Sequence, residues 1–124
     1  MTYKYFKLSE FDSPDLKGSG KNMKDEFVKL LDDSREIAGI PFRITSGFRT
    51  QSHHDDLGRR GYKTARRSAH LKGYAADISC QNSRDRWLIV NSLLLVGFNR
   101  IGIGSTFIHV DNDPEKSQNC IWTY

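Results

Sequence analysis

Apolar residues recur at helical spacing in two stretches of the chain. In residues 23–38 (MKDEFVKLLDDSREIA) they lie three and four positions apart, which predicts an amphipathic helix, and residues 82–98 (NSRDRWLIVNSLLLVGF) predict a second one. The expected caps are Asn22 and Gly39 for the first helix, and Ser83 and Gly97 for the second. The expected core-facing residues are Phe27, Leu30, Leu31 and Ile37 of the first helix, and Trp87, Leu88, Val90, Leu94 and Leu95 of the second.

Alternation of apolar and polar residues predicts strands elsewhere. The stretch PFRITSGF (41–48) alternates inward Phe42, Ile44 and Ser46 with outward Arg43 and Thr45. A further strand is expected around AADIS (75–79), and residues 99–124 predict two strands joined by a polar turn that contains Pro114. The loop 50–67 between them is polar and basic and has room for a short helix at QSHHDDLG (51–58). These elements predict an α+β fold, an antiparallel sheet with two main helices packed against it.

Length and charge limit the possibilities further. The chain has 124 residues, which suits one domain over 1–124, and 37% hydrophobic content is ordinary for a folded protein. A net charge of +4 favours an anionic partner, which could be a nucleic acid, a membrane surface or a cell-wall polymer. Much of the excess lies in RRGYKTARR (59–67), although a solvated loop is the simpler interpretation of such a run.

The cysteines and the N-terminus add little chemistry. Cys80 and Cys120 lie in apolar settings without CxxC spacing, so we expect buried free thiols, with a disulfide as the alternative. No apolar run is long enough to span a membrane. The first residues lack the apolar core of a signal peptide, so we expect synthesis in the cytoplasm and a separate route of release for any action outside it.

Three residues offer an economical metal site. Catalytic zinc takes three His or carboxylate ligands and keeps a fourth position for water, and His70, Asp77 and His109 could supply that set. Gly73 and the small residues that follow it would let a loop fold closely before the strand that carries Asp77. Taken alone, the His-x6-Asp spacing arises easily by chance, and a turn histidine with a strand-end carboxylate would explain it equally well.

Three motifs in order make a stronger signal. The combination of SGFRT (46–50), SAHLKGYAAD (68–77) and FIHVD (107–111) resembles the zinc peptidases of the D-alanyl-D-alanine carboxypeptidase family. That family includes D-Ala-D-Ala dipeptidases and phage endolysins that cut L-Ala–D-Glu bonds, and it shares its fold with hedgehog domains. Its pattern Ser-x-His-x-x-Gly-x-Ala-x-Asp is matched by Ser68, His70, Gly73, Ala75 and Asp77, and the resemblance covers nearly the whole chain from about residue 5.

The resemblance implies roles for individual residues. His70, Asp77 and His109 would bind one Zn²⁺ ion, and Arg49 would bind and polarise a substrate carbonyl or carboxylate. The further candidates are Ser68, which would hold the substrate or orient His70, and His53, which would help shape the cleft, whereas His54 is expected at the surface. Trp122 is expected in the core or in a cleft wall.

One position departs from the family pattern. Many members carry an acidic general base three residues before the last zinc histidine, where this chain has Thr106. Asp111 is our candidate base, because residues two apart on a strand share a face with His109. The alternatives for Asp111 are orienting His109 through its other ring nitrogen, or an exposed strand-end carboxylate. Asp113 is expected in the turn beside Pro114.

The predicted function is hydrolysis of a peptide bond in a peptidoglycan stem peptide, by a D,D-carboxypeptidase or an endolysin-type endopeptidase. The basic segment 59–67 would lie near the cleft mouth, and we expect a monomer that acts on the cell wall without a membrane or nucleic-acid partner. A phage or prophage product is expected, with a bacterial cytoplasmic enzyme as the alternative. A catalytically inactive, zinc-containing wall-binding module is the first alternative, favoured by Thr106. A basic nucleic-acid-binding domain is the second, although the chain has no recognised motif for it.

Overall fold

The computed structural model describes residues 2–62, 64–65 and 67–124, so Lys63 and Arg66 of the basic segment lie outside the described residues. The helices are α1 (Asp25–Ala38), α2 (Gln51–Arg59) and α3 (Ser83–Val96), with 3-10 helices η1 (Leu8–Phe11), η2 (Ser19–Asn22) and η3 (Ala69–Lys72). The strands are β1 (Ile44–Ser46), β2 (Ala75–Ser79), β3 (Arg100–Ile103), β4 (Phe107–Asp111) and β5 (Cys120–Thr123). The α+β class is confirmed, and α2 is the short helix allowed for at 51–58.

The C-terminal stretch forms three strands where the sequence predicted two. A turn at residues 104–106 splits it into the antiparallel pair β3 and β4. The sheet order is β1-β2-β4-β3-β5, and it is mostly antiparallel as predicted, with the one exception among the described strands that β5 pairs with β3 in parallel. Because β2 and β3 occupy both sides of β4, the returning chain pairs with the outer edge of β3.

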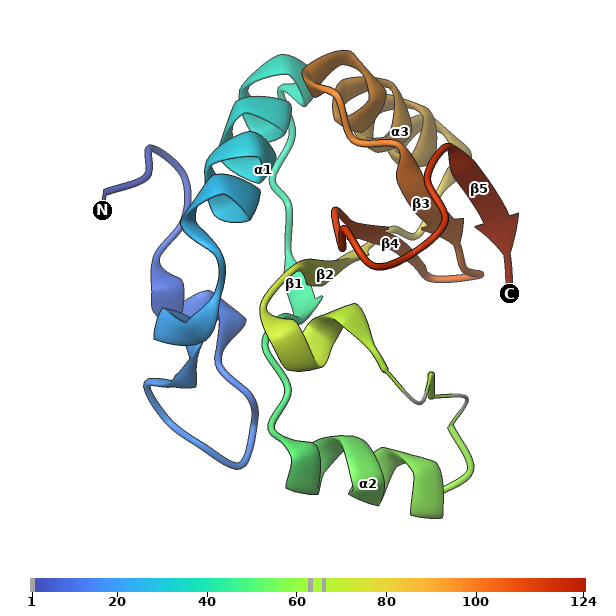
Figure 1. Ribbon diagram of the computed structural model, residues 1–124. Helices are drawn as coiled ribbons and strands as arrows, with labels where there is room; N and C mark the ends of the chain where they lie inside the picture. Colours follow the sequence, from blue (N-terminus) through green and yellow to red (C-terminus); the bar gives the residue numbers. More distant parts are fainter. Residues whose placement is uncertain (1, 63, 66) are drawn as a thin grey trace.

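Helices α1 and α3 lie side by side over one face of the sheet (Figure 1). Alternate strand residues point toward them and form the core, which includes Ala76 and Ile78 of β2, Ile101 of β3, and Ile108 and Val110 of β4. The rings of Phe27 and Phe98 meet there in an edge-to-face contact at 5.5 Å between centroids. The opposite face of the same strands is left for polar chemistry.

The predicted helix faces were only partly right. In α1, Phe27 and Leu31 are fully buried and Leu30 is half-buried, but Ile37 is exposed. In α3 the predicted face was wrong: Trp87 and Leu95 are about two-thirds exposed, at 65% and 64%. Leu94 is also exposed and Leu88 and Val90 are half-buried, whereas Ile89, Ser92 and Leu93 face the core. Apolar residues surround most of α3, so its contacts with α1 and β4 select the buried face.

The helix ends also differ in detail from the prediction. Asn22 closes η2, and α1 begins after Lys24, which has no side-chain capping bond. Asn82 caps α3 in place of Ser83, and its side-chain oxygen accepts a hydrogen bond from the backbone N–H of Asp85 at 2.8 Å. Gly39 and Gly97 end their helices in the left-handed conformation, as predicted.

Both cysteines are free thiols, but only Cys80 is buried, whereas Cys120 is half-buried. Among the described residues, every helix is too short or too polar to cross a membrane.

Candidate metal centre

A row of paired residues crosses all five strands on the face away from α1 and α3. Ser46 of β1 pairs with Asp77 of β2, and Asp77 pairs with His109 of β4. His109 then pairs with Gly102 of β3, which pairs with Trp122 of β5. Cross-strand neighbours have Cβ atoms about 5 Å apart, so this register alone brings Asp77 and His109 into contact.

His70 completes a cluster with these two residues. Its Nε2 lies 3.4 Å from Asp77 Oδ1, and His109 Nδ1 lies 3.0 Å from the same oxygen. One ligand atom from each of the three residues lies within 4.8 Å of the others. Donors at zinc-ligand distances of about 2.0–2.1 Å around a tetrahedral ion lie about 3.3 Å apart, so the set fits a single zinc ion.

The ring orientation of His70 is fixed by a backbone carbonyl. Nδ1 of His70 donates a hydrogen bond to the carbonyl of Gly47 at 2.8 Å, which leaves the lone pair of Nε2 directed at the cluster. Only a glycine fits at position 47, because a Cβ there would lie 2.7 Å from the Phe11 backbone. Burial lowers the pKa of His70, which favours the neutral ring that a metal requires.

His109 lies between two carboxylates. Its Nδ1 contacts Asp77 Oδ1, and its Nε2 lies 2.7 Å from Asp111 Oδ2. Burial acts to lower the pKa of His109, but the hydrogen bonds with Asp111 and Asp77 outweigh it and raise that pKa. Both carboxylates accept hydrogen bonds from the His109 ring. A metal ion would take the place of the proton on Nδ1, and the N–H at Nε2 would still donate to Asp111.

The two aspartates stay ionised. Burial acts to raise the pKa of Asp77, but the opposing interactions with His70 and His109 hold it well below its ordinary value. The pKa of Asp111 is lowered in the same way, against burial, by hydrogen bonds with His109 and Arg100. At neutral pH His109 therefore lies between two negative charges, the candidate metal ligand Asp77 and the hydrogen-bond acceptor Asp111.

Arg49 lies beside the cluster. Its Nη2 is 3.7 Å from Asp77 Oδ2, the oxygen that faces away from the histidines, and its Nε donates to Ser46 Oγ at 3.2 Å. The backbone N–H of Arg49 donates to the carbonyl of His70, so the SGFRT segment and η3 hold each other in place. Burial lowers the pKa of Arg49, and the nearby Asp77 carboxylate opposes that shift.

Ser68 shapes the turn that carries His70. Its hydroxyl accepts a hydrogen bond from the backbone N–H of His70 at 3.2 Å as the N-cap of η3. Gly73 ends η3 in the left-handed conformation, with φ of 79°. The Ser-x-His-x-x-Gly motif is thus a single helical turn, capped at both ends, that leads directly into β2.

The cluster lies in a cleft of about 1030 Å³. The charged side chains lining it are Arg43, Arg49, Arg100, Lys116, Asp77 and Asp111, together with His53, His70 and His109. The lining holds four Arg and Lys side chains and two carboxylates, so it carries an excess of positive charge. Tyr62, Thr64 and Ala65 also line it, so described residues of the 59–67 segment do lie at the cleft.

Aromatic rings form the wall on the β5 side. The Trp122 ring lies 5.6 Å from the His109 ring, and Tyr124 contacts both Trp122 and Phe107. Gly102 makes room for this wall, because a Cβ there would lie 2.7 Å from Trp122 Nε1. Of the two places expected for Trp122, the structure selects the cleft wall.

Thr106 and Asp113 lie on either side of β4. Thr106 is exposed at the β3–β4 turn and lines the cleft, with no acidic side chain at that position. Asp113 does lie beyond the end of β4, but it is fully buried and pairs with Lys72 Nζ at 2.7 Å. It therefore ties the end of η3 to the turn after β4.

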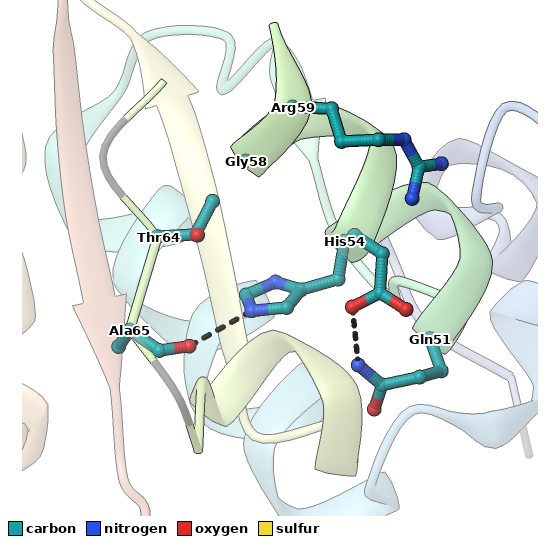
Figure 2. A pocket seen from close by; sticks show the side chains of 7 residues that line it. Gln51, His54, Gly58, Arg59, Thr64 and Ala65 are labelled. Atoms are coloured by element: carbon teal, nitrogen blue, oxygen red, sulfur yellow. Dashed lines mark hydrogen bonds between the residues drawn. The ribbon is translucent and has the colours of Figure 1, made fainter. Parts of the chain in front are cut away.

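The two adjacent histidines point in different directions. His53 lines the cleft, whereas His54 is buried, and the expectation of a surface position for it was wrong. Figure 2 shows His54 reaching from α2 to the segment beside it, where Nε2 lies 2.8 Å from the carbonyl of Ala65. His54 therefore braces the segment that borders the cleft.

Sequence reasoning missed Arg100. It lies on β3 two residues before Gly102 and so shares the cleft face, where its Nε donates to Asp111 Oδ1 at 2.6 Å. The alternation of RIGI was the signal available, because Ile101 and Ile103 point to the core and the residues between them must point to the cleft.

Comparisons with known proteins agree with this site. The sequence profile of the family described as Peptidase M15 matches residues 4–111, a range that contains His70, Asp77 and His109. No curated protein matches the chain.

Proposed function

The chain belongs to the Peptidase M15 family, and on this premise we propose that it is a zinc-dependent peptidase that hydrolyses a peptide bond in peptidoglycan stem peptides. The observation that carries the proposal is the convergence of His70, Asp77 and His109 from η3, β2 and β4, with one ligand atom of each within 4.8 Å of the others. A zinc ion in this set would lower the pKa of a bound water and polarise a carbonyl.

The residues around the cluster supply the rest of the chemistry. Arg49 directs a guanidinium into the cleft beside Asp77, where it would bind a substrate carboxylate or the oxygen on which charge develops. The cationic lining suits a stem peptide with free carboxylates, and the Trp122 wall would exclude water from one side. Action on the cell wall and release by a phage lysis system remain part of the proposal.

Asp111 fits the orienting alternative better than the role of general base. It is 1% exposed, and both of its oxygens already accept hydrogen bonds. The other carboxylate in the described cleft lining is Asp77, which is a candidate metal ligand. Whether the cleft has a group that accepts the proton of the attacking water therefore distinguishes a peptidase from a zinc-binding wall module.

The test uses purified protein, with metal content and fragment release from peptidoglycan measured with and without a chelator. One zinc per chain with chelator-sensitive release supports the proposal, and His70→Ala should abolish both. Zinc without any release would favour the non-catalytic wall-binding module, and no zinc at all would contradict both functions. Analysis of the released ends separates loss of D-Ala from cleavage at L-Ala–D-Glu.

The variant Asp111→Asn tests whether Asp111 is the general base or orients His109. A general base predicts lost turnover with unchanged zinc affinity, because only the proton transfer is removed. An orienting residue predicts that both fall, because the imidazole of His109 loses its charged acceptor.

A further inference from the structure

Arg100 is held in one orientation by three different contacts. Its Nε donates to Asp111 Oδ1, and its Nη1 donates to the carbonyl of Ser117 at 2.5 Å. The guanidinium also lies over the Trp122 ring, 4.9 Å from its centroid. The side chain is only 11% exposed, so these contacts replace most of its hydration.

Asp111 is fixed in turn. Oδ1 accepts from Arg100 and from the backbone N–H of Asp113 at 3.2 Å, and Oδ2 is left to His109 Nε2. At 1% exposure the Asp111 carboxylate depends on these protein donors, and without the guanidinium Oδ1 would keep only the backbone donor. Arg100 therefore fixes where the two Asp111 oxygens lie.

These contacts form a chain that ends at the metal cluster. Arg100 contacts Asp111, Asp111 contacts His109 Nε2, and the opposite ring nitrogen of His109 faces Asp77 Oδ1. The same ring cannot present a lone pair at Nδ1 unless its remaining proton stays on Nε2.

We propose that Arg100 is a positioning residue of the metal centre: it fixes the Asp111 carboxylate, which in turn holds the His109 ring with Nδ1 toward Asp77 and the metal. The inference rests on the proposed function, because it takes zinc as the occupant. It assigns Arg100 no contact with substrate. A lysine would restore one charge but not the fork that holds Asp111 and Ser117 together.

The matched control is a second arginine that is held by the same kinds of contact on the other face of the sheet. Arg35 of α1 donates from Nη1 to the carbonyl of Tyr5 at 3.2 Å, and its guanidinium lies over the Phe6 ring, 5.2 Å from the centroid. In the described structure it contacts none of the three cluster residues. Arg35→Gln therefore removes a packed guanidinium without touching the chain of contacts to His109.

The experiment compares Arg100→Gln, Arg100→Lys and Arg35→Gln. The zinc dissociation constant is measured by competition with a chelating dye, the melting temperature is measured on metal-free protein, and the Co²⁺-loaded protein gives the ligand-field spectrum. We expect Arg100→Gln to weaken zinc binding by about 10–100-fold and to change the Co²⁺ spectrum. Arg100→Lys should fall between it and wild type, and Arg35→Gln should lower the melting temperature only.

An unchanged dissociation constant in Arg100→Gln would overturn the inference while leaving the proposed function intact. So would an equal loss of affinity in Arg35→Gln, because the effect would then follow stability. If Arg100→Gln does not fold, the lysine variant decides by the same readout. A wild-type protein that binds no zinc would overturn the proposed function together with the inference.

Discussion

The two histidines of the cluster differ in what holds their second nitrogen. His70 donates to a neutral carbonyl, whereas His109 faces a carboxylate backed by an arginine. A charged acceptor makes the bound imidazole a stronger ligand than a neutral one does. His109 is therefore the ligand whose strength depends most on its surroundings.

Arg49 should matter for turnover and not for metal binding. It approaches Asp77 Oδ2, whereas the cluster uses Oδ1. We expect Arg49→Gln to lower kcat/KM by about 10²–10³-fold with zinc affinity unchanged, measured on a stem-peptide substrate. Arg43→Gln removes a cation from the same cleft away from Asp77 and should cost far less. Equal losses in the two variants would mean that Arg49 contributes only general charge.

Motif residues were predictable singly, but their contacts were not. His70, Asp77 and His109 could be proposed because zinc restricts which side chains can bind it, and the structure brings all three together. No comparable chemical restriction pointed to Arg100. Its contact with Asp111 depends on how β3 and β4 are aligned, which the sequence does not specify locally. Asp111 shared the face of His109 as expected, but its engagement by Arg100 could be seen only in three dimensions.

The turn that joins η3 to β2 is packed against a distant element. Gly73 has φ of 79°, and a Cβ on it would lie 2.3 Å from the backbone oxygen of Asn22. We expect Gly73→Ala to lower the free energy of unfolding by on the order of 3 kcal/mol, through backbone strain plus the clash, and to weaken zinc binding by displacing His70. Urea denaturation and chelator competition measure the two effects.

Gly39 provides the comparison for that variant. Its φ is 70°, and a Cβ on it would have no atom within 4 Å, so Gly39→Ala carries the backbone cost of about 1 kcal/mol alone. Gly73→Ala should therefore be clearly the more destabilising of the two. Similar losses would show that the Asn22 backbone moves aside freely.

Elements were predicted best where polar residues mark one face. The alternation in PFRITSGF correctly gave Phe42, just before β1, as buried, and the first turns of α1 gave Phe27. The inward position expected for Ser46 was wrong, because the register shifts between Ile44 and Ser46 and Ser46 lines the cleft. Helix α3 gave the wrong face, because its apolar residues surround the axis and only α1 and β4 decide which of them are covered. The parallel pairing of β5 also has no local signal in the sequence. It depends on β2 and β3, which occupy the two sides of β4 and leave β5 to pair with β3.

The folded molecule as a whole should lose stability in strong alkali. Burial, together with a hydrogen bond to Asp25, raises the pKa of Tyr3 from 10.0 to about 12. Between these values the unfolded chain has already lost the tyrosine proton that the folded chain retains, so stability falls as pH rises from about 10 to about 12. The contribution is complete below pH 10.

The variant Tyr3→Phe tests this directly. We expect its free energy of unfolding, measured by urea denaturation, to fall less steeply with pH than that of wild type over this interval. Absorbance near 295 nm should show one high-pH tyrosine transition fewer. Identical pH slopes in the two proteins would mean that Tyr3 ionises as readily in the folded state as in the unfolded one.

The row of residues that crosses the five strands limits how this chain can change over generations. One residue inserted or deleted within β4 would turn His109 to the side now occupied by Ile108 and Val110, and would bring apolar side chains into the cleft. Insertions and deletions should therefore accumulate in the connections, such as residues 112–119, while β2 and β4 keep their lengths. Substitutions elsewhere in the chain should be tolerated more often than a one-residue register shift inside either strand, because such a shift would separate His109 from His70 and Asp77.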